Sequence, residues 1–364
     1  MGKRFLIGQL GCYGDCLIAT TLAKQIKHDY PESHLTWAIS SKFKSILEQN
    51  PYVDKIWEIP YENIIGKDWN YFEKEAEIAR ENGAYDEIFY TQVHLKNLKD
   101  FFFTLRKTVL GIYKKPITVD ISPVVRLSER EVENVKNFAQ KNHLTDFKQV
   151  ILFECSPNSN QSKLNADIAI QVAETITKNR KDVCFILSTP QKLPFSSPQI
   201  VDASELTFRE NAELTKYCDL LVGCGSGISW ISTSDWAKKL PLLQFLDIES
   251  PTFAGIHYDF ELQNLNVDHI IEVLEYDTEH IINCISSILK IGIEKSKPLF
   301  HQNYRPNYYN LKSSIELFSF QGKNPIQIFW FARQYIRRNN EMGNQISGAY
   351  LRLIIRLFYF YTVR

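Results

Sequence analysis

The sequence predicts an α/β protein made of two Rossmann-like, doubly wound domains that face each other across a cleft, followed by a C-terminal helical extension. Short apolar strands alternate with helices at the start of the chain, and the alternation restarts near residue 146. Each half has a glycine-rich loop directly after a strand. Strands separated by helices form parallel sheets through right-handed crossovers, with ligands beyond the carboxyl ends of the strands. We therefore expect domains at 1–145 and 146–297 and an extension at 298–364.

The first unit opens with an apolar strand at Phe5–Ile7, a tight loop and a helix. Glycines mark the loop and apolar residues at helical spacing mark the helix: Gly8, Gly11 and Gly14, then Ile18, Leu22 and Ile26. Unpaired amides and the helix dipole make such a corner attractive to anions. Asp15 stands in this corner. Its negative charge argues against a phosphate on this loop and favours a group that accepts a proton from a substrate hydroxyl.

Six further elements are expected in the first unit, with a connection at Pro116–Pro123 and a last helix at Ser128–Asn142. Ser128 and Glu131 have the spacing of a capping box, which indicates where the last helix begins. The other strands and helices are Leu35–Ser40, Lys42–Gln49, Lys55–Ile59, Tyr71–Asn82, Glu87–Thr91 and Leu95–Leu110.

The second unit repeats the pattern around another glycine loop. Its predicted strands and helices are Val150–Glu154, Ala166–Lys178, Val183–Ser188, Phe208–Tyr217, Leu220–Val222, a helix through Trp236, Leu240–Phe245 and Thr278–Ile293. The loop Gly223-Cys-Gly-Ser-Gly227 follows one of these strands. Amides at a strand-to-helix turn can hold a phosphate. The alternative is a tight turn that needs positive φ at its glycines.

The extension differs from the rest of the chain in composition. Between Asn324 and Arg364 there are six arginines and one acid, Glu341, among many aromatic and aliphatic residues. Amphipathic helices of this kind lie on anionic membrane surfaces or pack across the two domains. We favour packing for Pro325–Arg338, and both alternatives stay open for Ser347–Tyr361.

Composition excludes several classes of function. A formal net charge of zero gives no field that recruits nucleic acid. The seven cysteines are odd in number and scattered without a CxxC pair, which indicates reduced thiols in a cytosolic protein and argues against a metal site. Only Lys3 and Arg4 precede the first apolar run, and no stretch reaches transmembrane length. We expect a cytoplasmic protein, with contact to the inner face of the membrane as an option of the extension.

Three segments resemble glycosyltransferase family 9, the ADP-heptose:lipopolysaccharide heptosyltransferases, which have the glycosyltransferase-B fold. Leu10–Leu22, followed by Asn50–Asp54, is similar to the opening R-x-G-x-x-G-D segment of that family. Val150–Glu154, with the polar residues after it, is similar to the donor segment that contains a lysine. Leu221–Trp230 is similar to V-G-x-D-S/T-G-x-x-H. The resemblance covers roughly residues 1–290.

The resemblance implies a catalytic base at Asp15. Inverting glycosyl transfer needs a base for the acceptor hydroxyl, and cationic or N–H donors for the departing diphosphate. The alternative role of Asp15 is to cap the following helix. Gly11 and Gly14 belong to the acceptor-side loop. The implied donor-binding residues are Ser156, Ser162, Lys163, Gly223, Gly225, Ser226, Gly227 and Trp230.

Some of these residues also have a plain structural interpretation, and some depart from the family pattern. Lys163 is otherwise a solvated loop lysine, and Trp230 is otherwise a core tryptophan. Gly225 replaces the acid of the family pattern and Trp230 its histidine, which leaves the donor open. Weaker candidates for donor contacts are Glu154, Asp247 and Glu249.

The sequence therefore predicts a metal-independent, inverting glycosyltransferase. It would move a sugar from a nucleotide-diphosphate donor, ADP-heptose or another, to lipopolysaccharide or another surface glycan, with no cofactor. One alternative is a module that binds a nucleotide sugar without turnover. Another alternative is a nicotinamide-dependent oxidoreductase. Asp15 argues against it, because its negative charge lies where the dinucleotide pyrophosphate would approach.

Overall fold

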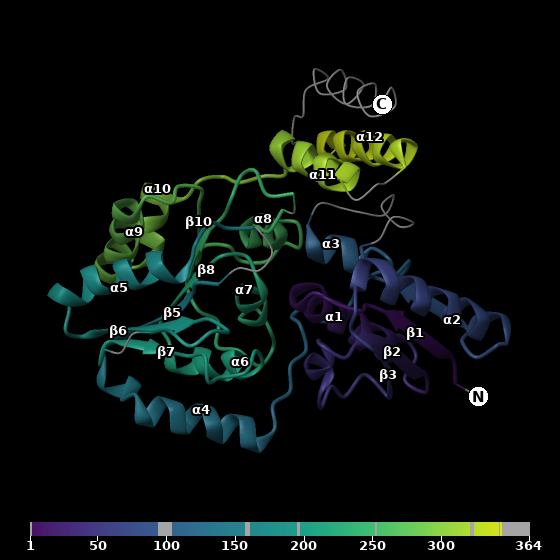
Figure 1. Cartoon of the computed structure of the whole chain (residues 1–364), viewed down its shortest axis with the longest axis horizontal. Coiled ribbons are helices and arrows are strands. Elements are labelled where there is room, and N and C mark those ends of the chain that lie inside the picture. Colours follow the sequence, from purple (N-terminus) through teal and green to yellow (C-terminus); the bar gives the residue numbers. More distant parts are fainter. Residues whose placement is uncertain are drawn as a thin grey trace.

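The computed structural model describes residues 2–93, 104–156, 161–194, 197–251, 253–320, 324–341 and 343. Two sheets lie side by side, each with helices packed against it (Figure 1). The first has four strands in the order β3-β2-β1-β4, and the second has six in the order β10-β9-β8-β5-β6-β7. All strand pairs in both sheets are parallel. The prediction of two Rossmann-like α/β domains is confirmed.

The first sheet is covered on both faces because alternate residues of its central strand enter different cores. Phe5 and Ile7 pack with residues of α1, whereas Leu6 packs with Phe72 of α2. The expected helix at Lys42–Gln49 is only a short turn, which ends where Gln49 adopts a positive φ of 58°. The elements are β1 (Arg4–Gly8), α1 (Tyr13–Asp29), β2 (His34–Ser40), η1 (Lys44–Leu47), β3 (Lys55–Ile59), η2 (Ile64–Asp68), α2 (Trp69–Glu81), β4 (Glu87–Tyr90) and α3 (Leu105–Leu110).

The start of the helix expected at Leu95–Leu110 lies outside the described residues, and α3 is its described end. In the second sheet, the helix expected through Trp236 stops at Ile231. The elements of this half are β5 (Gln149–Glu154), α5 (Ala166–Asn179), β6 (Val183–Ser188), β7 (Ile200–Asp202), α6 (Glu210–Leu214), η5 (Thr215–Tyr217), β8 (Leu220–Gly223), α7 (Gly227–Ile231), β9 (Leu242–Phe245), α8 (Ile256–Glu261), β10 (Ile270–Val273), α9 (Thr278–Ile291) and α10 (Ile293–Phe300).

Helix α4 (Glu129–Lys141) begins at the expected capping box and packs on the second half of the chain. Ser128 Oγ accepts from Glu131 N at 3.3 Å, and Glu131 Oε2 accepts from Ser128 N at 2.8 Å. Asn134 Nδ2 donates to Glu210 Oε1 of α6 at 3.0 Å. The sequence assigns this helix to the first domain. In the structure α4 contacts α6 of the second half, and the short turn η4 (Leu144–Asp146) follows its end.

The described part of the extension packs over both halves. Helices α11 (Tyr308–Phe320) and α12 (Pro325–Glu341) lie against each other near α8 and α3 (Figure 1). Asn310 of α11 donates from Nδ2 to Ser250 O at 2.8 Å, and Val93 packs against the core of this helix pair. No helix among the described residues is long and apolar enough to span a bilayer. The expected helix Ser347–Tyr361 lies outside the described residues.

Two buried arginines join the halves. Arg209, just before α6, donates from Nη1 to Ser45 O and Glu48 O, both at 2.8 Å. Arg106 of α3 pairs with Asp259 of α8 at 2.9 Å, and both side chains are fully buried. A buried ion pair is worth little in net stability, but it is costly to break because one charge is left without its partner. These contacts fix the relative position of the two glycine loops.

Candidate functional site

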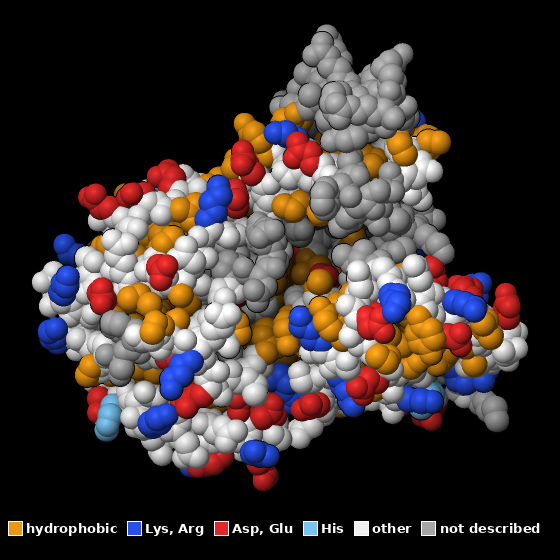
Figure 2. Space-filling view, in the orientation of Figure 1, with side chains coloured by type: hydrophobic (Ala, Val, Ile, Leu, Met, Phe, Trp, Pro, Cys, Tyr) orange, Lys and Arg blue, Asp and Glu red, His pale blue; other side chains and the backbone are white. Residues whose placement is uncertain are grey.

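The first turns of α1 and α7 meet where the two halves face each other. A Cβ on Gly14 would lie 3.1 Å from Trp230 Cδ1, and a Cβ on Gly227 would lie 3.2 Å from Tyr13 Cβ. A side chain at Gly14 would require its neighbours to shift by a few tenths of an ångström, and one at Gly227 would also lie 2.7 Å from Phe208 Cε2. Figure 2 shows a hollow between the two lobes with hydrophobic side chains on its visible walls. The glycine loops thus come together although they are far apart in the sequence.

Asp15 lies in the first turn of α1, half-buried at this junction. The N-cap of α1 is Cys12, so Asp15 does not have the capping role. Burial raises the pKa of Asp15 to about 7, and a hydrogen bond from the Cys12 thiol opposes this shift. A carboxyl group with a pKa near the working pH is suited to general base catalysis.

Cys12 is a residue that the sequence did not single out. Its φ of 67° and ψ of 120° are strained for a residue with a side chain. Burial and the neighbouring Asp15 raise the pKa of its thiol to about 12, so the thiol stays protonated and serves as a donor to that carboxylate. The sequence does not reveal this strain, because Gly11 and Gly14 are the residues of this loop that are expected to take unusual backbone angles.

Two buried glutamines hold the acceptor-side loop in place. Gln9 Nε2 donates to Gly11 O at 2.8 Å, and Gly11 N donates to Gln92 Oε1 at 3.0 Å. The two side chains are also joined at 3.0 Å. A Cβ on Gly11 would lie 2.3 Å from Ile64 Cδ1, so this position also requires glycine. Gln9 stands where the family pattern has an arginine or lysine and Gln92 belongs to no motif, so their pairing follows from the pairing of β1 with β4.

The carboxylate of Glu154 lies behind the second glycine loop, on its buried side, and accepts hydrogen bonds from it. Glu154 ends β5, is buried, and accepts from Cys224 N and Ile228 N, both at 2.9 Å. The hydroxyls of Ser226 and Ser229 each donate to it at 2.5 Å. We expected the amides of this loop to hold a phosphate. The amide of Cys224 in the loop, and those of Ile228 and Ser229 in the first turn of α7, instead donate to this carboxylate.

Two glycines of this loop show why its backbone is so compact. Gly225 has a φ of 73°, and a Cβ on it would lie 2.8 Å from Ala254 Cβ. A Cβ on Gly223 would lie 2.4 Å from Ser229 Oγ, the hydroxyl that donates to Glu154. Both the positive φ and the close contacts require glycine. The tight-turn interpretation of the loop therefore accounts for these two residues without a ligand.

Trp230 belongs to the packing between the halves. It is 3% exposed, and Arg106 Cζ lies 5.9 Å from the centre of its ring. Its edge faces Gly14 of α1. The ring is buried against the first half, as the interpretation of Trp230 as a core tryptophan implies, and its role in donor binding stays a prediction.

The remaining donor-side candidates lie at the carboxyl ends of the second sheet. Lys163 is 61% exposed, and its Nζ lies 3.3 Å from Asp247 Oδ2. Ser162 Oγ accepts from Leu164 N at 3.3 Å. Ser156 is half-buried, and Glu249 N donates to Asp247 Oδ1 at 3.0 Å. Lys163 is the exposed cation of this group, but it is already paired with Asp247.

In the described part of the chain, no three His, Cys, Asp or Glu side chains gather as they do around a metal ion. The seven cysteines, all described, are free thiols.

No protein-family model and no curated protein matches the sequence. Solved structures do share its fold. The glycosyltransferase family 9 protein of Veillonella parvula DSM 2008 matches with a TM-score of 0.53 and 16% identity, over 80% of this chain and 93% of that one. The E. coli ADP-heptose LPS heptosyltransferase II matches with a TM-score of 0.53 and 13% identity, over 79% of this chain and 98% of that one. These identities establish the fold, and they confirm the expected resemblance at that level.

Proposed function

We propose that this chain is an inverting glycosyltransferase that uses a nucleotide-diphosphate sugar and in which Asp15 is the catalytic base. The observation that carries the proposal is the half-buried carboxyl of Asp15, with a pKa near 7, at the junction of two Rossmann-like halves. The fold shared with a family 9 glycosyltransferase and a heptosyltransferase supports the same reaction class.

In the proposed reaction, Asp15 takes the proton of an acceptor hydroxyl while that oxygen attacks the anomeric carbon of the donor. The bond from this carbon to the diphosphate oxygen breaks on the opposite face, which inverts the configuration. The leaving diphosphate gains negative charge and needs a cation or N–H donors. Lys163 is the candidate cation, and it must give up its contact with Asp247 to serve the donor.

The proposed donor is ADP-heptose or another nucleotide-diphosphate sugar, and the proposed acceptor is lipopolysaccharide or another surface glycan. The family 9 resemblance supports both. We propose transfer without a metal ion, because lysine and amide groups can offset the charge of the leaving group. Turnover that is unchanged by EDTA would support this part, and loss of turnover that Mg²⁺ restores would refute it.

We propose a cytoplasmic protein whose extension contacts the membrane. Helix α12 exposes Ile326 at 59% and Trp330 at 50%, and Arg333 lies 5.2 Å from the tryptophan ring. Tryptophan with arginine is typical of the surface of anionic bilayers. Flotation with anionic vesicles should recover the protein, and Trp330→Ser should weaken recovery. Equal recovery from neutral vesicles, or none from either, would refute this contact.

A second candidate is a module that binds nucleotide sugars without turnover. Two observations favour it: Glu154 occupies amides of the donor-side loop, and Trp230 is buried. A buried carboxylate behind the loop opposes the binding of a diphosphate at the same place. The two candidates differ in chemistry but not in fold, so only an assay of turnover separates them.

The first test is a thermal-shift screen of ADP-, GDP-, UDP- and CMP-linked sugars, because a specific ligand raises the melting temperature by mass action. Turnover is then followed as release of free nucleotide in the presence of glycan acceptors. Asp15→Asn should bind the donor and lose turnover. Asp167→Asn is the matched control, since Asp167 is also in the first turn of a helix, α5, and is exposed.

The outcomes are distinct. Donor binding with turnover that only Asp15→Asn abolishes supports the transferase. Donor binding without turnover by any acceptor supports the binding module. No stabilisation by any of the nucleotide sugars refutes both.

A further inference from the structure

A second cavity, of about 280 Å³, lies between the two halves and away from the glycine loops. It is lined at the amino ends of β9 and β10 by Leu242 and Ile270. The Gly223–Gly227 loop follows the carboxyl end of β8, a parallel neighbour of β9. The cavity is therefore at the opposite end of the second sheet from the candidate active site.

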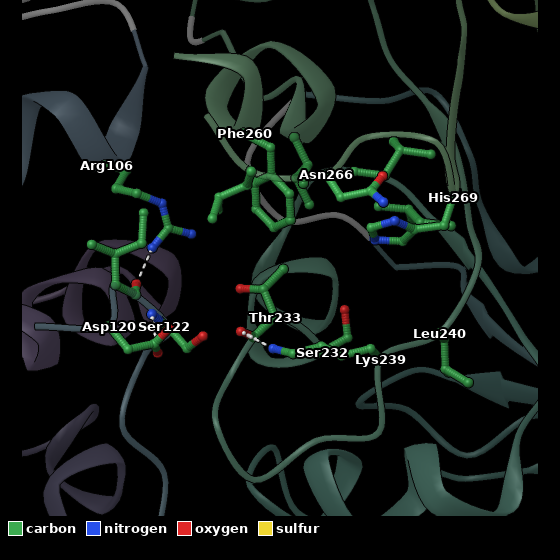
Figure 3. Close-up of a pocket in the computed structure, with 15 residues that line it drawn as sticks. Arg106, Asp120, Ser122, Ser232, Thr233, Lys239, Leu240, Phe260, Asn266 and His269 are labelled. Carbon is green, nitrogen blue, oxygen red and sulfur yellow. Dashed lines mark hydrogen bonds between the residues drawn. The ribbon is translucent and has the colours of Figure 1, made fainter. Parts of the chain in front are cut away.

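The interior of the cavity is mostly apolar. Leu240, Ile256 and Ile270 are buried in its wall, and Phe260 presents its ring to the space (Figure 3). Arg106 approaches from the first half, where its guanidinium also donates to Ile121 O. A ligand here would touch residues of both halves of the chain.

The polar groups at the rim are mainly donors. Lys239 Nζ donates to Thr233 O at 3.0 Å and Ser234 O at 3.1 Å, which uses two of its three N–H groups. Within the described ranges, no carboxylate lies within salt-bridge distance of it. Asn266 Oδ1 accepts from Asp268 N at 2.7 Å, so its amide nitrogen is the part left to donate. His269 points its imidazole into the space (Figure 3).

Charges of both signs surround the cavity. Burial lowers the pKa of His269 and Lys297 lowers it further, whereas Asp268 raises it by more than Lys239 lowers it. Asp120 is the carboxylate in the lining, and its Oδ1 already accepts from Ser122 N at 3.0 Å. Arg106 is balanced by its buried partner Asp259. Lys239 is thus the cation of the lining that has no carboxylate bonded to it.

We propose that this cavity is a binding site for a small organic acid, a carboxylate on a short aromatic or branched aliphatic body. The carboxylate would accept a hydrogen bond from Lys239, and the body would lie against the apolar lining, with Phe260 and Leu240. Such pockets combine an apolar lining with a few placed polar groups. Because both halves line the cavity, an occupant favours the arrangement in which they are closed together.

The site adjoins the donor side through α7. This helix begins at Gly227 of the glycine loop and ends next to Ser232 and Thr233, which line the cavity. Arg106 contacts both the cavity and the ring of Trp230. A ligand in the cavity therefore contacts the far end of the helix that carries the donor-side loop. The binding proposal itself does not depend on glycosyl transfer.

The test uses the full chain with phenylacetate and its neutral analogue phenylacetamide, followed by saturation-transfer NMR in the absence of any nucleotide sugar. Phenylacetate should bind in the low-millimolar range expected for so small a ligand. It should bind about tenfold more tightly than phenylacetamide, because the amide oxygen accepts from the ammonium without the negative charge of a carboxylate.

The variant Lys239→Gln should reduce this preference to about twofold or less, since a neutral donor replaces the ammonium. Lys238→Gln is the matched control: the neighbouring Lys238 is exposed and bonds to Cys218 O at 2.7 Å, outside the lining. Leu265→Phe, which fills the cavity from a loop, should weaken both probes.

Three results would overturn the proposal. The first is equal affinity of the wild-type chain for the acid and the amide. The second is a preference that survives Lys239→Gln or is lost equally in Lys238→Gln. The third is no saturable binding of phenylacetate. None of these measurements involves turnover, so they leave the proposed transferase activity untouched.

Discussion

The protonation of Asp15 predicts how turnover depends on pH. Its pKa of about 7 means that the carboxylate, the form that can act as a base, is about a tenth of the total at pH 6 and about nine-tenths at pH 8. The value of kcat/KM should therefore rise about tenfold over this interval and then level off. Solvated aspartates titrate near 3.9 and would give a flat profile in this range.

Two variants at Cys12 show whether this rise of kcat/KM with pH, the rising limb of the profile, comes from the titration of Asp15. The thiol lowers the pKa of Asp15 by hydrogen bonding, so Cys12→Gly should move the limb to higher pH. Glycine also accepts the φ of 67° without strain, so the fold should not suffer. Cys12→Ser keeps a donor and should leave the limb in place or move it to lower pH.

The assay is the release of nucleotide at saturating acceptor between pH 5.5 and 8.5 at constant ionic strength. Asp15→Asn should abolish the limb and lower turnover by about 10²- to 10⁴-fold, the usual contribution of a general base. The reasoning is refuted by a limb that persists in Asp15→Asn, or by a wild-type profile that is flat across this range.

Three further predictions concern stability and donor affinity. Asp15→Asn should raise the free energy of unfolding above pH 7 by about 1–3 kcal/mol, allowing for partial solvation, because the pKa of this carboxyl is higher in the folded than in the unfolded chain. In urea unfolding the gain should shrink toward pH 4. A gain that does not depend on pH contradicts the prediction. Glu154→Gln should raise the affinity for nucleoside diphosphates in calorimetry about tenfold, since it removes a negative charge behind the donor-side loop; an unchanged or lower affinity contradicts this. Arg106→Met should cost about 3–5 kcal/mol in urea unfolding by leaving Asp259 buried and unpaired, and adding Asp259→Leu should recover much of it; a small loss with no recovery contradicts it.

The parts of the fold that the sequence predicts correctly depend on local patterns. Short apolar runs mark β1, β2, β5 and β6, each buried along nearly its whole length. The capping box at Ser128 marks the start of α4 because both of its hydrogen bonds lie within one turn. These signals need no knowledge of tertiary contacts, so the parallel α/β architecture follows from them.

The parts that the sequence does not predict depend on contacts between distant residues. Helix α4 packs on α6 through residues such as Asn134 and Glu210, which are 76 positions apart. Arg106 and Asp259 are 153 positions apart, and neither belongs to a motif. Strands β7 and β10 and helix α8 are also missed, because each is too short to show a clear period. Trp230 is ambiguous for the same reason: only the approach of Gly14 decides that its ring is buried.

Asp15 and Glu154 show what a motif can and cannot predict about a site. Both are carboxylates beside a glycine loop after a parallel strand, so the same local pattern describes each. Asp15 is half-buried and has a pKa raised to about 7, with a hydrogen bond from the Cys12 thiol, and these properties suit the proposed role of a base. Glu154 is buried and accepts hydrogen bonds from amides and two serine hydroxyls, so its role is to stabilise the loop.

The hydrogen bonds of Glu154 limit how the proposed diphosphate donor can bind. A diphosphate cannot use the amides that Glu154 already occupies, and its charge must be met by groups on the open side of the loop. Lys163 is the cation that we propose for this role, and Asp247 competes for it. The affinity for the donor should therefore fall as the salt concentration rises, because an exposed lysine makes the main contact with the diphosphate. A diphosphate donor whose affinity is insensitive to salt and to Lys163→Ala would show that Glu154 leaves its place when the donor binds.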